Sequence, residues 1–166
     1  VEVVDKETGS KIEGAKFEIY YKKADGSEEK VREFTTGAEN YTTTRLAVGE
    51  YILRQVANQK ESVQDKGYAT LGDISFVIED TAEMQKVTAE QDHTKLEVEV
   101  IDKETGSKIE GAKFEIYYKK ADGVEEKVRE FTTGAENYTT TRLAVGEYIL
   151  RQVAEQKESV QDKGYA

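Results

Sequence analysis

A long internal repeat constrains the fold of this chain more than any other feature. Residues 1–69 recur as residues 98–166 with an offset of 97, whereas the segment Thr70–Glu97 occurs once. The two copies differ at three positions only: Val4 becomes Ile101, Ser27 becomes Val124 and Asn58 becomes Glu155. A unit of 97 residues has the size of an autonomous domain, unlike short solenoid repeats that must stack to be stable. We therefore expect residues 1–97 to be a complete repeat and residues 98–166 to be a second copy that is incomplete at its C-terminal side.

Short segments with strand-like alternation fill each unit. In Ala15–Lys22, for example, the apolar Phe17 and Ile19 alternate with polar neighbours, which indicates a half-buried strand. Turn signals such as Asp25-Gly26 separate these segments. The strands expected in the first unit are 1–5, 15–22, 30–36, 41–46, 50–56, 74–78 and 84–89, with a further strand over 95–101 that runs into the second copy. The polar stretch Asn58–Lys66 is compatible with a loop or a short helix. About seven short strands at this spacing predict an all-β sandwich.

Composition excludes several classes of function. The net charge is −10 and no basic cluster occurs, which argues against binding to nucleic acid or to an anionic lipid surface. The chain has no Cys, so disulfide and thiolate chemistry are excluded. No apolar run approaches the ~20 residues of a membrane span, so we expect no membrane insertion in this fragment. No signal peptide or sorting signal is present, so in a surface protein this sequence would be an internal fragment.

Several motifs occur in an order that is typical of one family. The stretch Asp5–Tyr20 contains Asp-x-x-Thr-Gly and then Gly-Ala-x-Phe, and it returns unchanged as residues 102–117. Leu-x-x-Gly-x-Tyr follows at residues 46–51, and then come Gly67-Tyr68 and the apolar strand 74–78. The chain resembles the B-type repeat of Gram-positive collagen adhesins and pilins, the Cna-B or SpaA-like domains. The resemblance implies an Ig-like or prealbumin-like β-sandwich in tandem, with neighbouring repeats as partners.

The resemblance also implies a crosslink that this sequence lacks. Many members of the family join a buried Lys to an Asn or Asp through an isopeptide bond, assisted by a buried acid. The positions equivalent to the Lys are Val3 and Val100, and those equivalent to the acid are Gln55 and Gln152. The acceptor is expected near Gln91-Asp92, and we assign it to Asp92. Because no nucleophile remains without the Lys, we predict that no isopeptide bond forms in either copy.

Other chemistry has little support. An ester between Thr and Gln would need a buried Thr that nothing singles out, so we interpret His93, the only His, as a solvated residue of a polar junction. No nucleophile elbow, phosphate loop or metal-spaced His cluster is present. We expect no enzymatic activity, no cofactor and no metal site.

The preferred interpretation is a structural one. We expect a stalk or spacer repeat of an adhesin or pilin-like protein, extracellular and anchored at the cell wall. The alternative is a module that binds a host protein or glycan. Its surface would be the polar stretch that contains Asn58, Lys60, Glu61 and Gln64.

The incomplete second copy leads to a last expectation. It lacks counterparts of residues 70–94, so one sheet should have a bare edge and an open core face. That segment should pair with residues 1–69 in ordinary chain order, the alternative being a permuted pairing with residues 98–166. A bare edge attracts strands, so we expect strand exchange with another chain, or a longer repeat array, to complete the second copy.

Overall fold

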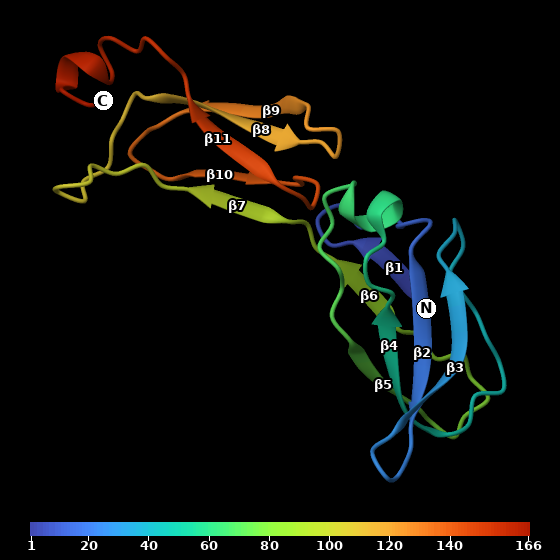
Figure 1. The fold of residues 1–166 in the computed structure, drawn as a ribbon. Coiled ribbons are helices and arrows are strands. Elements are labelled where there is room, and N and C mark those ends of the chain that lie inside the picture. Colours follow the sequence, from blue (N-terminus) through green and yellow to red (C-terminus); the bar gives the residue numbers. More distant parts are fainter. The chain divides into compact units, whose positions relative to one another are not determined.

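The computed structural model describes all residues from Val1 to Ala166 (Figure 1). The elements group into two compact units, Val1–Thr94 with Arg142–Val145, and Lys95–Thr141 with Gly146–Ala166. The chain is built almost entirely from strands, so the expected all-β class is confirmed. In chain order the elements are β1 (Glu2–Asp5), β2 (Lys16–Lys22), β3 (Glu28–Thr35), β4 (Gly49–Gln55), the π-helix η1 (Lys60–Gln64), β5 (Ile74–Ile78), β6 (Thr88–Gln91), β7 (Lys95–Val98), β8 (Lys113–Lys119), β9 (Glu125–Thr132), β10 (Tyr138–Thr141), β11 (Tyr148–Gln152) and the 3-10 helix η2 (Gln161–Lys163).

The first unit contains two sheets. One has four antiparallel strands in the order β3-β2-β4-β5, and the other is the parallel pair β1-β6. The segment that occurs once in the sequence therefore supplies one strand to each sheet. It pairs with residues 1–69, so the expected ordinary chain order is confirmed.

The core of the first unit lies between these sheets. Alternation along β2 and β4 turns Phe17, Ile19, Tyr51 and Leu53 inward, and each of these side chains is almost completely buried. Full burial of one such side chain stabilises a fold by about 1.5–3 kcal/mol. Val3, Ala89 and Val63 belong to the same cluster, so both sheets and η1 contribute to it. On the edge strand β5, Phe76 stacks on Tyr51 with ring centroids 5.5 Å apart.

The repeated Asp-x-x-Thr-Gly motif forms a tight turn after β1. The Asp5 Oδ1 atom accepts hydrogen bonds from the backbone N–H groups of Glu7 and Thr8, at 2.8 and 3.2 Å. The turn closes with a bond from Gly9 N–H to the Asp5 carbonyl, and Gly9 has a φ of 73°, a conformation that glycine adopts without strain. Asp102 makes the same bonds to Glu104 and Thr105 in the second unit.

The second unit repeats this architecture with fewer strands. Its sheets are the three-stranded β9-β8-β11 and the antiparallel pair β7-β10. The register of β8 against β9 matches that of β2 against β3, including the shift after Ile116 that corresponds to the one after Ile19. The difference lies at the edge, because β11 pairs only with β8, whereas β4 lies between β2 and β5. The bare edge expected from the sequence is confirmed.

Several expected elements have different limits. Residues 41–46 are not a strand in the first unit, although the copies of 41–44 form β10. The reason is that β10 has a partner in β7, whereas in the first unit only Tyr41 makes backbone-to-backbone hydrogen bonds, with Val1. The expected strand 84–89 is displaced to β6, where it meets β1. The strand expected over 95–101 ends at Val98, and beyond it only an isolated bridge joins Ile101 to Lys108. The polar stretch 58–66 contains the short η1.

Candidate functional site

Two glutamines meet in the core at the positions where the family resemblance predicts a crosslink. Gln55 ends β4 and Gln91 ends β6, and both side chains are buried. Their amides bond reciprocally: Gln55 Nε2 donates to Gln91 Oε1 at 3.0 Å, and Gln91 Nε2 donates to Gln55 Oε1 at 2.9 Å. One glutamine comes from each sheet, so this pair joins the two layers of the sandwich.

The glutamine pair also satisfies nearby backbone groups. Gln55 Oε1 accepts a hydrogen bond from Leu71 N–H at 2.7 Å, and Gln91 Nε2 donates to the Ala69 carbonyl at 3.0 Å. A buried amide without such partners would be destabilising, since its desolvation costs about 1–3 kcal/mol. Both amide side chains are uncharged and hydrogen-bonded. The pair therefore anchors the loop before β5 and does not present a reactive group.

Asp92, the position expected for the acceptor, does not face Gln55. Because neighbouring strand residues point to opposite faces, β6 turns Ala89 and Gln91 inward and leaves Asp92 partly exposed. The Asp92 carboxylate lies 3.7 Å from Lys6 Nζ and accepts the N–H of His93. The period-two pattern of residues 88–91 was the signal that could have identified Gln91 from the sequence.

No lysine of the chain is placed to act as the missing nucleophile. Val3, at the position of the reactive Lys, is buried in the core. Every lysine side chain belongs to an exposed residue. Amide formation needs a neutral amine, the form that burial of a lysine favours.

The second copy has the same residues in a different setting. Val100 is half-buried, and Gln152, at the end of β11, is exposed. The chain has no second copy of Gln91, since that residue lies in the segment that occurs once. The residues at this site are therefore the same in the two copies. The copies differ in the strands that cover these residues.

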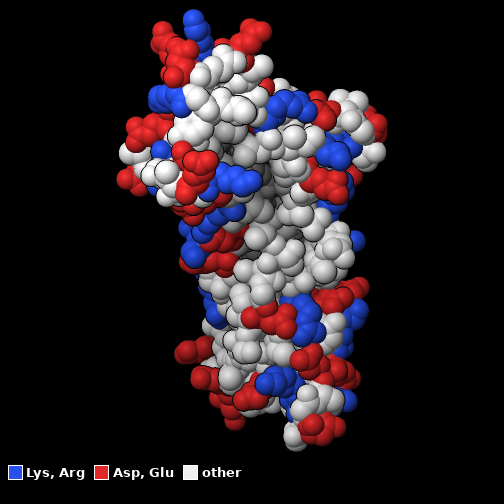
Figure 2. Space-filling view, turned by 60° about the vertical axis from the view of Figure 1, so that its left-hand side comes forward, with Lys and Arg blue, Asp and Glu red and all other residues white.

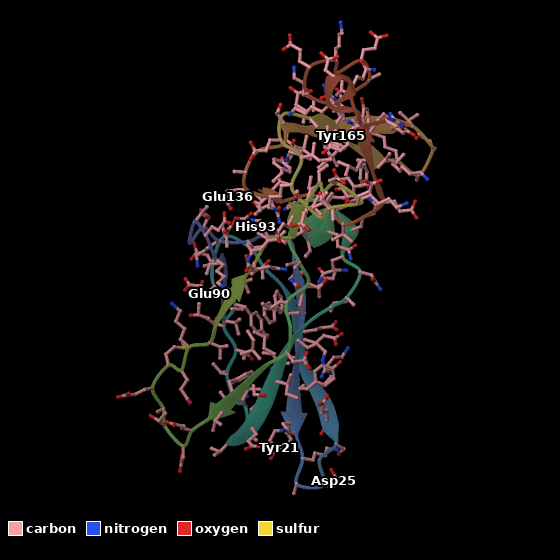
Figure 3. All side chains as sticks on the ribbon, turned by 90° about the vertical axis from the view of Figure 1, so that its left-hand side faces the viewer. Tyr21, Asp25, Glu90, His93, Glu136 and Tyr165 are labelled. Atoms are coloured by element: carbon pink, nitrogen blue, oxygen red, sulfur yellow. The ribbon has the colours of Figure 1, made fainter.

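A buried polar cluster lies beside the turn that follows β1, and sequence reasoning missed it. The side chain of His93 is 1% exposed, so the expectation of a solvated junction residue is wrong. Figure 3 labels His93 among the side chains. Its Nε2 atom lies 3.2 Å from Asp5 Oδ2, and its ring stacks on Tyr68 with centroids 4.6 Å apart. His93 Nδ1 is buried without a hydrogen-bond partner, 3.8 Å from Glu7 Oε1. His93 is buried because an isolated β-bridge pairs its backbone with that of Tyr68 in the first unit.

Hydrogen bonds stabilise the charge of Asp5 in this cluster. Burial disfavours the carboxylate, but bonds from the Tyr68 hydroxyl (2.8 Å) and from two backbone N–H groups, together with His93, outweigh it and lower the pKa of Asp5. Burial and the bond to Asp5 raise the pKa of Tyr68 to about 12. No serine, threonine or cysteine is held against His93 as a nucleophile, so the cluster has the composition of a structural network.

The positions predicted as a ligand surface lie on and beside η1. Asn58 precedes the helix with a φ of 59°, and Lys60 Nζ binds the Asp65 carboxylate at 2.8 Å. Glu61 is exposed and Gln64 is half-buried. This surface is a solvated helix face with local ion pairing.

An apolar hollow of about 240 Å³ opens elsewhere in the first unit. Tyr41, Thr42, Phe76 and Val87 are among the residues that line it. In the second unit the counterparts of Tyr41 and Thr42 are strand residues of β10 that pair with β7.

The surface gives no sign of a metal or nucleic-acid site. No group of three or more His, Cys, Asp or Glu residues is arranged to hold a metal ion. On the face shown in Figure 2, acidic and basic side chains are interspersed, with no extended basic area. None of the helices combines the length and the apolar character that crossing a bilayer requires.

A family comparison agrees with this fold. The model of the SpaA prealbumin-like fold domain matches the chain twice, over residues 1–93 and 94–165. The chain belongs to this SpaA family. The family resemblance expected from the motifs is thus confirmed, and so is the tandem prealbumin-like fold. No curated protein matches the chain significantly.

A search of solved structures finds similarity to three further proteins. The Bacillus anthracis TIE protein is 22% identical with a TM-score of 0.48, over 93% of this chain and 28% of that one. A streptococcal ancillary pilin is 18% identical with a TM-score of 0.41, over 92% of this chain and 51% of that one. A C-terminal fragment of the pilus adhesin SpaC from Lactobacillus rhamnosus GG is 15% identical with a TM-score of 0.36, over 91% of this chain and 73% of that one. This SpaA-family chain thus spans about half or less of the first two proteins.

Proposed function

We propose that the chain is a structural spacer from the stalk of a surface adhesin or pilin-like protein, located outside the cell and anchored to the wall of a Gram-positive bacterium. The observation that carries the proposal is the tandem of near-identical SpaA-family units, which differ at three of the 69 shared positions. A spacer gains length from each identical copy. A binding site gains little from a duplicate that faces elsewhere.

The chemistry of the core supports a passive role. The two glutamine side chains are uncharged and hydrogen-bonded to each other. His93 contacts Asp5 and stacks on Tyr68, and no nucleophilic side chain is held against it. We propose that the chain is not an enzyme and uses no cofactor or metal. Neighbouring repeats of the same protein are its partners.

The domain limits follow from the same reasoning. We propose that residues 1–97 form one complete repeat and that residues 98–166 are a second copy of it, incomplete at its C-terminal side. The pairing of β5 and β6 with the first copy, and the lack of such strands beside β11, support these limits.

We propose further that neither unit forms an isopeptide bond. The intact mass of the purified chain is expected to equal the mass calculated from its sequence. A crosslink would remove ammonia or water, a loss of about 17 or 18 Da, and that result would contradict the proposal. The double variant Val3→Lys, Gln55→Glu is the matched comparison. It places beside Gln91 the Lys and the acid that the family resemblance implies at these two positions.

The spacer role is tested by a binding screen of the chain against host extracellular proteins and glycans. We expect no saturable binding. Specific binding that is lost on replacing Lys60 and Glu61 on η1 would favour a ligand-binding module instead, with the Asn58–Gln64 surface as its site. The equivalent replacements of Lys157 and Glu158 in the second copy serve as controls.

A further inference from the structure

The strand β5 is an open edge of the four-stranded sheet in the first unit (Figure 1). It pairs with β4 on one side, and the backbone of residues 74–78 makes no hydrogen bond to any other segment. In an antiparallel ladder the backbone groups of alternate residues point away from the paired neighbour. A row of N–H and C=O groups along β5 is therefore available to a further strand.

The opposite edge of the same sheet, β3, is protected in ways that β5 is not. Five of the eight residues of β3 are charged. The Arg32 guanidinium donates to Thr43 Oγ1 at 3.0 Å and to the Thr44 carbonyl at 3.1 Å, so a neighbouring segment contacts this edge. β5 has no charged residue and no such contact. Charged side chains and covering segments are the usual means by which a sheet edge is kept from pairing, so β5 is the edge that can accept a strand.

The side chains of β5 restrict which strand it can accept. Ile74, Phe76 and Ile78 pack against the core, whereas Ser75 and Val77 face water, and Val77 is 56% exposed. A strand added to this edge continues the same alternation, because side chains directly opposite each other lie on one face of the sheet. An added strand therefore needs apolar residues at every second position, opposite the three inward side chains of β5.

Unpaired acidic side chains lie at the C-terminal end of β5. Glu79 and Asp80 follow the strand directly and are exposed. The nearest lysine in the sequence, Lys86, is paired with another carboxylate at 2.9 Å. At the other end of the strand the Asp73 carboxylate is already bound by Arg54, at 2.7 Å. The charge that is free to attract a partner is therefore negative and lies at one end of the edge.

A second copy of the chain fits this edge poorly. An antiparallel pair of two β5 strands centred on Phe76 would place Glu79 of one chain opposite Asp73 of the other. Like charges directly opposite each other on neighbouring strands are destabilising. The charges therefore favour a different partner, one that carries Lys or Arg beside Glu79 and Asp80.

We propose that β5 binds an extended segment of another protein in which two Lys or Arg residues precede a short run of alternating apolar residues. The segment adds antiparallel to β5, as all strands of this sheet pair, with its basic end beside Glu79 and Asp80. Main-chain hydrogen bonds provide affinity, and the apolar and basic side chains provide specificity. The inference goes beyond the spacer role and does not depend on it, because an extended segment with a free backbone is a different class of partner from a folded host protein or a glycan.

The experiment adds the synthetic peptide Lys-Lys-Val-Thr-Val-Thr-Val to the full chain and follows amide exchange by mass spectrometry. Residues 70–97 occur once in the sequence, so proteolytic fragments that contain β5 are unambiguous. We expect saturable binding, at least fivefold slower exchange in residues 74–78, and at least tenfold weaker binding of Glu-Glu-Val-Thr-Val-Thr-Val. The absence of binding, protection confined to other segments, or equal affinity for the two peptides would overturn the proposal.

A double variant of the chain tests the role of the acidic end. Glu79→Lys combined with Asp80→Lys changes two exposed side chains, and we expect it to reverse the preference so that the peptide with Glu-Glu binds more tightly. Glu158→Lys combined with Asp162→Lys makes the same change of net charge at exposed residues of the second copy, and it should leave the preference unchanged. The same preference in both double variants would contradict recognition at β5.

Pairing through the main chain is tested with two further peptides that carry N-methyl groups on alternate backbone nitrogens. One set of nitrogens faces β5 and the other faces water, because successive N–H groups of a strand point to opposite sides. We expect one methylated peptide to bind like the unmodified one and the other to bind at least tenfold more weakly. Equal affinity of the two would contradict strand addition, as would a chain that self-associates through β5 and is not dissociated by the peptide.

Discussion

At the scale of single residues, the core of the first unit shows how two amides can take positions that the family resemblance assigns to a crosslink. Gln55 and Gln91 join the two sheets through reciprocal hydrogen bonds and also satisfy Leu71 N–H and the Ala69 carbonyl. Such a pair is strong only while all of its members are present, since the loss of one leaves the others buried without partners.

Replacement of Gln91 by Leu should therefore destabilise the first unit. The variant leaves Gln55 Nε2 and the Ala69 carbonyl without their partner, and we expect a decrease of about 1–3 kcal/mol in the free energy of unfolding, measured by urea titration. Gln152→Leu is the matched control, because Gln152 is exposed, and its effect should stay within about 0.5 kcal/mol. Equal effects of the two variants would contradict a structural role for the pair.

The Asp5–Tyr68 bond should make stability depend on pH in a defined direction. The pKa of Asp5 is lowered in the folded state, so its contribution is present above the usual pKa of about 3.9 and is lost as the pH falls below it. The pKa of Tyr68 is raised to about 12, so its contribution is present below about pH 10 and is lost as the pH approaches 12.

Tyr68→Phe tests this linkage. It removes a donor to the Asp5 carboxylate, so the loss of unfolding free energy should be larger at pH 7 than at pH 2.5, where the carboxyl of the unfolded chain is protonated and the contribution of Asp5 to stability is reduced. Unfolding midpoints in urea at the two pH values measure the difference. Tyr165→Phe is the matched change in the second unit, and its effect should be smaller because Asp102 is more exposed than Asp5. A loss that is independent of pH would show that the hydroxyl does not act through Asp5.

At the scale of elements, identical sequences form different structures where their partners differ. Tyr138–Thr141 is a strand because β7 pairs with it, whereas residues 42–44 have no such partner and no strand assignment. The strands β4 and β11 have the same sequence and the same partner on one side, but only β4 is covered by β5 on the other. A strand is completed by its neighbours, so its local pattern predicts where it can form and not whether it is paired.

At the scale of the whole molecule, the two units should differ in stability. Most of the fully buried apolar side chains belong to the first unit, and the second lacks the strands that would cover Leu150 and its neighbours. The loss of two or three such burials amounts to roughly 5 kcal/mol, which is comparable to the entire stability of a small domain.

We therefore expect the full chain to unfold in two steps, with residues 98–166 opening first. A chain that ends at Glu97 should retain the more stable transition and lack the other. Calorimetry of both chains, with sizing and light scattering to exclude association, measures this. A single transition of the full chain, with equal amide protection in both copies, would show that the second unit is complete as it stands.

The sequence alone determined the family, the all-β class, the repeat and the ordinary chain order of the strands. These depend on period-two alternation, turn residues and short connections, all of which are local in the chain. The tertiary structure decided that Gln91 rather than Asp92 faces Gln55, that His93 is buried, and that residues 42–44 form no strand while their copies belong to β10. Each of these outcomes depends on a partner far away in the chain. The elements that pack against a polar side chain determine whether it is buried and hydrogen-bonded or exposed to water. In this protein, identical residues of the two copies are found in both states.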